Sequence, residues 1–457
     1  MIQDSRIHFL NDTPPITDNR YVLYWMQSSH RTRYNHALEY AIREANRHQK
    51  PLLVYLGVTA AYPEANLRHF QFMLEGLQAV AENLARRQIP FLVEPISPEA
   101  GALKLSHRAV LIVVDKGYQR HERDWRKTVA ENAPCQVVAV ETNVMVPVKA
   151  ASPKEEYSAA TLRRKIEHLI PEYSLPLSET PLHRSDLPGD LALRLTGSRE
   201  LAELFAKLPL DTSVPPVSRY FRGGEAVAEE LLEQFLDHGL TGYATERNDP
   251  AYGVTSNLSP YLHFGQLSPL EIYLKLLDTH SEDKRSFLDE LIVRRELAVN
   301  FVYYNPNYDT YDAITSFARE TLDRHAQDIR LPLYELSELE AGATYDPYWN
   351  AAQQEMVQTG KMNGYMRMYW GKKVIEWSPS PGEAYRRLVY LNNKYSLDGR
   401  DHNGYAGIAW CFGKHDRAWA ERPIFGKVRY MNDKGLQRKF RIDDYVAKVN
   451  QLRTETP

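Results

Sequence analysis

The segment "NGYMRMYWGKKVIEW", from Asn363 to Trp377, concentrates oxidisable side chains, with two Trp, two Tyr and two Met in fifteen residues. Trp370 and Trp377 lie about two helical turns apart and would project from nearly the same face of a helix. Trp349, in "DPYWNAAQ", is expected on a neighbouring helix, where it could bridge them. Packing in a hydrophobic core is the usual role of such a stripe. The density of oxidisable groups on one helix nevertheless needs a reason.

A second group with chemical potential is "GVTSNLSPYLHFGQLSP", from Gly253 to Pro269. Thr255, Ser256 and Ser259 place hydroxyls and free backbone N–H groups just before an apolar helix. A helix N-terminus attracts anions because its first N–H groups have no partner within the helix. The segment could therefore hold a phosphate or pyrophosphate, although Ser and Thr are also ordinary N-caps.

The net charge of −3 is unevenly distributed along the chain. From Lys361 onward, 19 Lys and Arg stand against 10 Asp and Glu, which leaves +9 here and −12 in the first 360 residues. This separation suits a polyanionic partner for the C-terminal segment, and a solvated surface with chance clustering is the alternative.

The elements that position these residues follow two patterns. In the first half, apolar segments alternate with helical stretches over His30 to Gln49 and Asn66 to Arg87; the apolar segments are "YVLYWM", "PLLVYLGV", "IPFLVEP", "AVLIVVD" and "CQVVAVE". Strands separated by helices of this length form right-handed βαβ units and a parallel sheet. The loops at the carboxyl ends of its strands are the usual ligand crevice. No GxGxxG or Walker sequence supports dinucleotide or P-loop chemistry.

The second half carries amphipathic helices joined by turns with Pro or Gly, and strand signals vanish. We predict a Rossmann-like α/β domain over residues 1–180, a linker rich in Pro, Leu and Ser over 181–218, and an all-α domain over 219–457.

The chain carries no sign of a membrane span or of secretion. No apolar run approaches the roughly 20 residues that a span needs, and the N-terminus lacks the apolar core of a signal peptide. Cys135 and Cys411 fit no metal-binding spacing, so no metal site is expected. Two unpaired thiols suit a reducing cytoplasm.

Four segments carry a family resemblance. "TSNLSPYLHFGQLSP" resembles the flavin phosphate-binding segment of the photolyase/cryptochrome family. "LIVRRELAVNFVYYNPNYD", "MNGYMRMYWGKKVIEW" and "LDGRDHNGYAGIAWCFGKHDRAW" together resemble the class II cyclobutane pyrimidine dimer photolyases. The resemblance covers nearly the whole chain, including the order of an α/β domain and then an α-helical FAD-binding domain.

The resemblance implies FAD, active as FADH⁻, in the helical domain, and an antenna chromophore (a deazaflavin or a folate) in the α/β domain. The implied FAD contacts are Tyr243, Thr255, Ser256, Asn257, Leu258, Ser259, Arg367, Asp398 and Gly399. Arg367 would favour the anionic reduced flavin, and Asp398 would keep its guanidinium oriented. The asparagine that faces flavin N5 is Asn392 or Asn403, with Asn392 preferred. His402 stands where the family often has Pro, which puts the local turn in doubt.

The resemblance also implies a pocket for the lesion, two covalently linked pyrimidine bases that are flipped out of the duplex together. Glu290, a third catalytic candidate beside the two asparagines, would hydrogen-bond the dimer. The implied lesion and DNA contacts are Arg247, Arg294, Met368, Trp410, Lys414, Arg417, Arg422, Lys427 and Arg429. Arg294 stands where some relatives have a second Trp.

For the oxidisable helix, the resemblance implies an electron wire that runs from the surface to the flavin. Trp370 would be nearest to the flavin, Trp349 between, and Trp377 outermost.

The implied function is light-driven repair of cyclobutane pyrimidine dimers, in which photoexcited FADH⁻ passes an electron to the flipped dimer. We expect a monomeric enzyme, a deoxyribodipyrimidine photo-lyase, that binds damaged double-stranded DNA in the cytoplasm or with nucleoid DNA. A cryptochrome-like photoreceptor without repair activity is the alternative. Repair of (6-4) photoproducts is a further one, but it relies on an active-site His pair that the sequence does not reveal.

Overall fold

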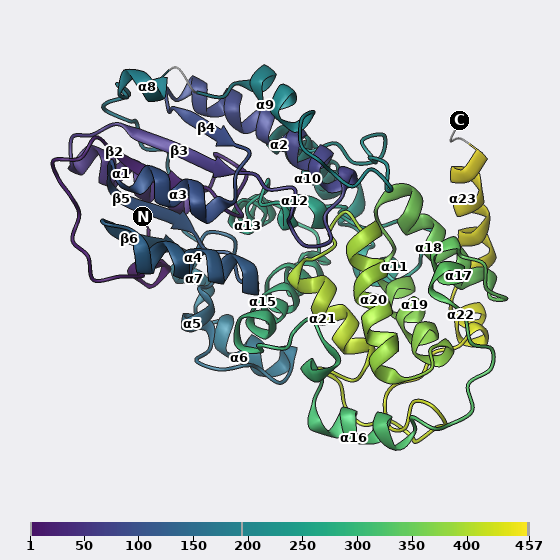
Figure 1. Cartoon of the computed structure of the whole chain (residues 1–457). Helices are drawn as coiled ribbons and strands as arrows, with labels where there is room; N and C mark the ends of the chain where they lie inside the picture. The colour runs from purple at the N-terminus through teal and green to yellow at the C-terminus, as the bar shows by residue number, and fades with distance from the viewer. Residues whose placement is uncertain (1, 193–194, 455–457) are drawn as a thin grey trace. The chain divides into compact units, whose positions relative to one another are not determined.

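The computed structural model describes residues 2–192 and 195–454 (Figure 1). The chain divides into two compact units that interleave along the sequence. The first comprises Met1–Pro153, Arg164–Gln234 and Asn257–His280, and the second comprises Lys154–Arg163, Phe235–Ser256 and Ser281–Pro457.

The first unit is built on a six-stranded sheet in the order β1-β6-β5-β2-β3-β4. Its strands are β1 (Ile7–Phe9), β2 (Tyr21–Trp25), β3 (Leu52–Gly57), β4 (Phe91–Glu94), β5 (Ala109–Asp115) and β6 (Gln136–Val140). All neighbouring pairs are parallel except β1 and β6, which are antiparallel. The five parallel strands match the predicted apolar segments. The edge strand β1 escaped prediction because three residues are too short to show a hydrophobic period.

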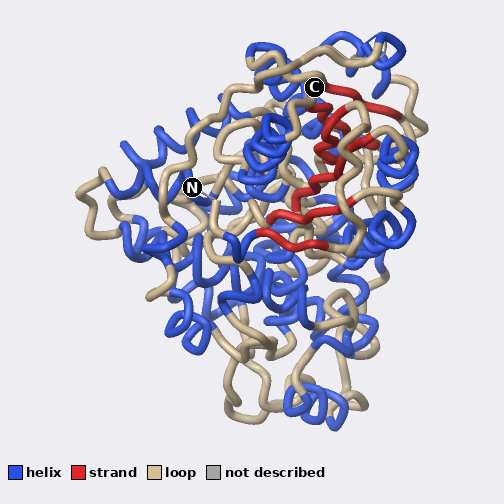
Figure 2. The backbone as a smooth tube through the Cα atoms, turned by 90° about the vertical axis from the view of Figure 1, so that its left-hand side faces the viewer, coloured by secondary structure: helices blue, strands red, loops and turns tan. Residues whose placement is uncertain are grey.

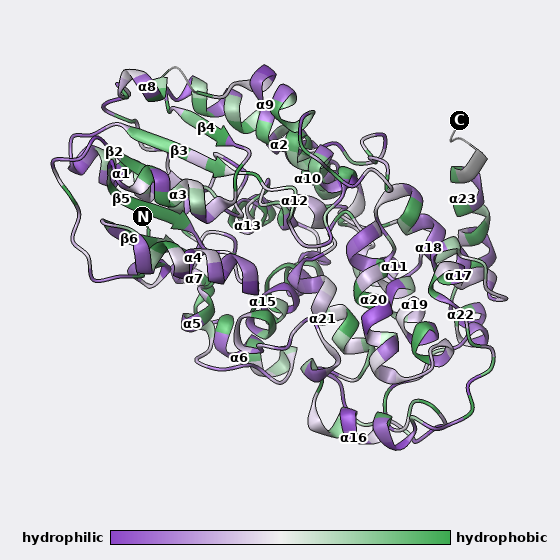
Figure 3. Ribbon diagram, in the orientation of Figure 1, coloured by the Kyte–Doolittle hydropathy of each residue, from purple (hydrophilic) through white to green (hydrophobic). Residues whose placement is uncertain are grey.

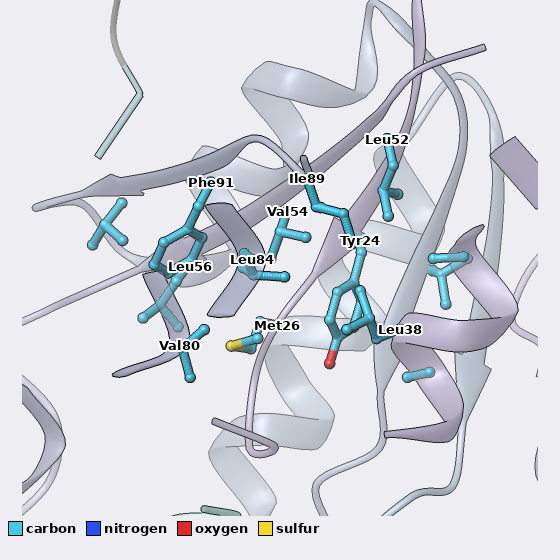
Figure 4. Packing of buried hydrophobic residues seen from close by; sticks show 14 of the residues in the cluster. Tyr24, Met26, Leu38, Leu52, Val54, Leu56, Val80, Leu84, Ile89 and Phe91 are labelled. Carbon is cyan, nitrogen blue, oxygen red and sulfur yellow. The ribbon is translucent and has the colours of Figure 1, made fainter. Parts of the chain in front are cut away.

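Helices cover both faces of this sheet, which appears in red in Figure 2. Because successive strand residues point to opposite faces, Tyr24 packs in one core and Trp25 in the other. The first core includes residues of the helices that follow β2 and β3 along the chain, and Figure 4 shows part of it around Tyr24 and Met26. The second core includes residues of the helices that follow β4 and β5. The parallel strands therefore read as nearly continuous apolar runs, green in Figure 3, since both of their faces are buried.

The helices of the first unit follow the strands along the chain. They are α1 (His36–Arg47), α2 (Leu67–Arg86), α3 (Pro98–Ser106), α4 (Arg120–Asn132), α5 (Val148–Ala151), α7 (Ile170–Tyr173), α8 (Gly189–Ala192), α9 (Ser198–Phe205), α10 (Glu225–Gln234), α12 (Ser259–His263) and α13 (Pro269–Leu277). A short 3-10 turn, η1 (Asp4–Arg6), precedes β1, and α6 (Ala159–Ile166) contains the boundary between the units.

The second unit is helical in the described residues. Its elements are η2 (Phe235–Gly239), α11 (Tyr243–Glu246), α14 (Lys284–Leu288), η3 (Asp289–Arg294), α15 (Arg295–Tyr304), η4 (Tyr311–Ala313), α16 (Ser316–Arg324), α17 (Leu336–Ala341), α18 (Pro347–Thr359), α19 (Gly364–Trp377), α20 (Pro381–Tyr395), α21 (His402–Cys411), α22 (Asp433–Lys439) and α23 (Ile442–Thr454). Of these, η2 and η3 are π-helical turns.

The central helices of this unit begin at side chains that cap them. Asp346 accepts from the backbone N–H groups of the first turn of α18, and Asn363 does the same for α19. Ser380 caps α20 and Asp401 caps α21. Each cap satisfies a backbone donor that the helix itself leaves unpaired. These four starts fix where each helix begins along the chain.

The α/β-then-helical fold is confirmed, whereas the domain boundaries at 180 and 218 stay a prediction. Within the predicted linker, Leu201 and Phe205 of α9 are buried in a core of the first unit. Among the described residues, none of the helices is both long and apolar enough to cross a membrane.

Candidate cofactor and substrate site

Arg367 lies at the centre of a cluster in the second unit, where α19 packs on α20 and on the turn after it. Its Nη1 donates to Asn392 Oδ1 at 3.3 Å, and its Nη2 donates to Asp398 Oδ1 at 3.4 Å and to Ser396 Oγ at 3.5 Å. Ser396 Oγ donates to Asp398 Oδ1 at 2.6 Å. Asn392 and Asp398 are buried. The structure therefore brings together the Arg and Asp that the sequence paired.

The turn after α20 runs very close to the end of that helix. A Cβ atom on Gly399 would lie 2.8 Å from the carbonyl oxygens of Asn392 and Ser396. A Cβ on Gly404, in α21, would lie 2.9 Å from Asn392 Nδ2. Glycine at both positions lets the chain enclose Asn392 without displacing its amide.

The two candidate asparagines have different surroundings. Asn392 is 2% exposed and contacts Arg367, whereas Asn403 is exposed and donates through Nδ2 to Asp401 Oδ1 at 2.8 Å. Only Asn392 belongs to the Arg367 cluster. His402, which put the local turn in doubt, is the first residue of α21 and follows the cap residue Asp401, so the turn is intact.

Two titratable groups beside this cluster were missed by sequence reasoning. Burial lowers the pKa of Lys361 to about 8, and Asp398 partly opposes that shift by favouring the charged ammonium. Burial raises the pKa of Glu355, although Tyr445 Oη donates to its carboxylate at 2.7 Å. Lys361 stands only two residues before the "NGYMRMYW" motif, but nothing in its own sequence context signals burial.

Glu290 and Arg247 form an ion pair at 2.6 Å between Oε1 and Nη1. The Arg247 guanidinium also lies 5.4 Å from the centre of the Tyr243 ring. These contacts place the Glu290 carboxyl group beside the Arg247 guanidinium. Arg247 Nε is buried and has no hydrogen-bond partner among the described residues.

Trp410 and Arg294 face one another, with the guanidinium 5.6 Å from the ring centre. The Arg294 side chain therefore packs beside the Trp410 ring, so the space beside that ring is filled. Trp410 Nε1 is buried and, in the part of the chain that the structure describes, also lacks a partner. Met368 lies against the same helix end, because its Sδ is 3.9 Å from Cys411 Sγ. The two donors without partners, one indole and one guanidinium, suit acceptor oxygens of a ligand.

The three tryptophans of the predicted wire are in contact. Trp349 stacks on Trp370 with 6.4 Å between ring centres and 9° between planes, and it meets Trp377 edge-on at 5.5 Å. Trp349 Nε1 donates to the Trp370 carbonyl oxygen, and Trp370 Nε1 donates to Gln353 Oε1. The Trp349 ring thus contacts the rings of both other tryptophans, and its place in an electron wire stays a prediction. Trp377 is 0% exposed, so the prediction that it lies at the surface end of the wire is wrong. The side chains of Tyr334, Tyr345 and Lys373 pack around its ring.

Of the predicted DNA-contacting cations after Trp410, one is in the wrong environment. Lys414 is buried, forms an ion pair with Glu155 and donates to the Ala313 carbonyl oxygen at 2.9 Å. The prediction that Lys414 contacts a DNA phosphate is therefore wrong, because its ammonium group is already paired with acceptors inside the protein.

Two of the remaining cations of this group flank an exposed tryptophan ring. Arg417 and Arg429 lie 5.0 Å and 5.2 Å from the ring centre of Trp419, which is 37% exposed. Arg422 and Lys427 are exposed. Trp419 was missed, although its position among alternating basic residues was a usable signal.

The predicted phosphate segment crosses the boundary between the two units after Ser256. Thr255 and Ser256 belong to the second unit, whereas Asn257, Leu258 and Ser259 belong to the first. The helix that follows, α12, has five residues, and Leu258 occupies its N-cap position without a side-chain bond. The N-capping alternative for the hydroxyls is therefore not realised at α12.

Comparisons with known proteins find relatives over the whole length of the chain. The family model described as DNA photolyase matches residues 22–183. The deoxyribodipyrimidine photo-lyase of Methanothermobacter thermautotrophicus is 48% identical over 455 residues and covers 100% of both chains. That of Potorous tridactylus is 39% identical over 441 residues, which cover 94% of this chain and 81% of the relative.

Solved structures share the fold at low identity. A class III photolyase from Agrobacterium tumefaciens has a TM-score of 0.70 at 18% identity, covering 94% of this chain and 86% of that one. A cryptochrome from Synechocystis has a TM-score of 0.71 at 17% identity, covering 95% and 88%.

Fold, family model and full-length relatives define one class, and the chain belongs to the photolyase/cryptochrome family. Its full-length relatives are deoxyribodipyrimidine photo-lyases, so the predicted resemblance and enzyme class are confirmed. Similarity to these photo-lyases implies DNA photorepair of pyrimidine dimers, and the photolyase family implies FAD as the cofactor.

Proposed function

We propose that this protein repairs cyclobutane pyrimidine dimers in duplex DNA by light-driven electron transfer, with FAD as its cofactor. The observation that carries the proposal is the cluster of Arg367, Asn392 and Asp398. Residues expected around the flavin ring lie within hydrogen-bonding distance although 31 positions separate Arg367 from Asp398.

The side chains of the cluster fit a flavin. Reduced FAD supplies the electron donor that light excites. Arg367 would stabilise negative charge on the ring, while Asp398 and Ser396 hold its guanidinium in place. The Asn392 amide both donates and accepts, so it can serve a ring nitrogen in either protonation state. Tyr243, Thr255, Ser256, Asn257, Leu258, Ser259 and Gly399 complete the proposed FAD contacts.

The lesion would be bound by groups that still have unused donors. Arg247 Nε and Trp410 Nε1 are buried, and no described residue pairs with them, so pyrimidine carbonyl oxygens are suitable acceptors. The Trp410 ring also offers a face for stacking. Glu290 would orient Arg247 through their ion pair. Flipping the dimer out of the duplex costs less than flipping a normal pair, because the lesion is already poorly stacked.

Trp370, Trp349 and Trp377 would relay electrons that restore the reduced cofactor. Their ring centres are 6.4 Å and 5.5 Å apart in succession, so each ring contacts the next. A purely structural stripe would give the same packing, and only oxidation chemistry separates the two roles.

A test uses a duplex with one cyclobutane dimer and FAD-loaded protein that has been reduced chemically. We expect dimer loss in the light, none in the dark, and slower repair by Glu290→Gln, which keeps the size of Glu290 but loses its charge. A protein that retains FAD and repairs nothing in the light would refute the proposal. It would support a cryptochrome-like photoreceptor, since the Synechocystis cryptochrome shares the fold.

The α/β unit is the proposed place of an antenna chromophore, a deazaflavin or a folate. The absorption spectrum of purified holoprotein tests this, because an antenna adds bands beyond those of FAD. We further propose a monomer that acts in the cytoplasm or on nucleoid DNA, which size-exclusion chromatography and localisation would check.

A further inference from the structure

The buried position of Trp377 leaves the proposed relay without an exit to solvent. Two tyrosine rings contact it edge-on, Tyr334 at 5.2 Å and Tyr345 at 5.6 Å. Trp377 is 0% exposed and Tyr345 is 59% exposed. Tyr345 is thus a solvent-accessible ring in direct contact with the last tryptophan.

We propose that Tyr345 is the solvent-facing end of the relay, an inference that rests on the electron-transfer role proposed above. Tyr345 gives one electron to the oxidised Trp377 ring, which returns to its neutral state. The phenolic proton passes to bulk water, and a neutral tyrosyl radical remains. A dissolved thiol then returns one hydrogen atom, that is, one electron and one proton, and becomes a thiyl radical.

Lys373 gives this transfer a direction. Its Nζ lies 5.4 Å from the ring centre of Trp377 and 5.9 Å from that of Tyr345, and the residue is 3% exposed. A nearby cation disfavours positive charge on Trp377, whereas a tyrosyl radical that has lost its proton carries no charge. Glu376 offsets part of the field, because its carboxylate lies 3.1 Å from the ammonium. Lys373 is therefore a positioning residue that favours the neutral radical on Tyr345 over the cation radical on Trp377.

The neighbouring tyrosines are less suited to this role. Tyr369 is fully buried and its Oη donates to the Asp346 carboxylate, so its proton cannot reach water directly. Tyr334 is half-buried, and its Oη accepts the Tyr345 backbone N–H at 2.9 Å. Tyr334 therefore helps to hold the segment that carries Tyr345.

The test illuminates FAD-loaded, oxidised protein with a thiol and a spin trap, then maps the adducts by mass spectrometry and records the frozen radical by electron paramagnetic resonance. We expect an adduct on Tyr345 and its loss in Tyr345→Phe, together with a lower photoreduction yield. Tyr252→Phe is the matched control: Tyr252 is 63% exposed and, among the described residues, contacts no tryptophan ring. Lys373→Met should shift the radical signal from tyrosyl toward tryptophanyl.

Three results separate failure of the exit from failure of the relay. If Trp377→Phe photoreduces like the parent, the relay itself is refuted. If Trp377→Phe abolishes photoreduction while Tyr345→Phe does not, only the exit is refuted. An adduct on Tyr334 or Tyr369 in place of Tyr345 also overturns the assignment. Repair by chemically reduced Tyr345→Phe should equal that of the parent, which reports separately on the proposed repair function.

Discussion

At the scale of single residues, Arg367 carries the electrostatics of the proposed flavin site. Replacing it by Gln should remove about 1.5–3 kcal/mol of interaction with an anionic ring. Each factor of ten by which binding of the reduced flavin weakens relative to the oxidised flavin lowers a one-electron reduction potential by about 59 mV. We therefore expect the reduction potential of the flavin to fall by at least that amount. Spectroelectrochemistry of the holoprotein measures it. Arg386→Gln, on the exposed side of α20, should leave the potential unchanged; an equal shift in both variants would contradict the assignment.

A substitution of Trp370, also a single-residue change, separates a role in electron transfer from a role in packing. Phe at this position loses the bond to Gln353 Oε1 and leaves that acceptor buried, which costs about 1–3 kcal/mol of unfolding free energy. FAD content should survive, but light should no longer reduce the cofactor efficiently, because Phe is much harder to oxidise.

Repair by chemically reduced Trp370→Phe should stay near that of the parent, because that assay bypasses the relay. The loss of photoreduction with retention of repair is measured by absorbance and by dimer assay. Photoreduction equal to that of the parent would leave the stripe a structural feature. Tyr365 is a poor alternative conductor, since its ring packs on Phe440 and Lys439.

At the scale of elements, His325 joins α16 to the segment that carries the basic residues. Its Nδ1 lies 2.6 Å from Asp328 Oδ2 and its Nε2 lies 3.1 Å from Glu421 Oε1. The bond to Asp328, and then that to Glu421, raises the pKa of His325 above its ordinary value of 6.5. Because the folded state raises this pKa, the stabilisation is full below pH 6.5 and is lost as the pH rises through the raised value.

We therefore expect the segment around Ile424 to loosen on the alkaline side of that transition. Ile424 N–H donates to Asp328 at 2.7 Å, so its hydrogen exchange reports on the junction. His325→Asn should exchange fast at every pH and show no transition. A transition that persists in this variant would assign the pH dependence to another group.

At the scale of the whole molecule, the basic segment should give DNA affinity that falls steeply with salt. Arg429→Gln removes a partly exposed cation beside Trp419 and should reduce the slope of log affinity against log salt by about 0.9, the value of one phosphate contact. Trp410→Ala should instead weaken the preference for damaged over intact duplex. Fluorescence anisotropy at several salt concentrations separates the two effects, and a common phenotype would contradict this division.

Lys414→Met is the matched control for that experiment. Its ammonium is buried against Glu155, so the salt slope should not change. Stability should fall by roughly 3 kcal/mol or less, because Glu155 is partly exposed and keeps some hydration. A flattened slope in Lys414→Met would mean that the ammonium reaches DNA after all.

The sequence by itself determined the parallel strands, the helical character of the second unit and the family. Strand and helix signals are local, because they depend on hydrophobic period and on single cap residues such as Asp346 and Asp401. The pairing of Arg367 with Asp398 followed from family motifs long enough to be specific.

Only the tertiary structure decided which of these side chains are buried and what they contact. Lys414 reads as a free cation, yet chain segments 101 and 259 positions away enclose its ammonium. Trp377 reads as an outer ring, yet Tyr334 and Tyr345 cover it. Asn392 and Asn403 are alike in type, and only the packing of α19 on α20 places the first beside Arg367. Burial is a sum over distant segments, so no local pattern records it.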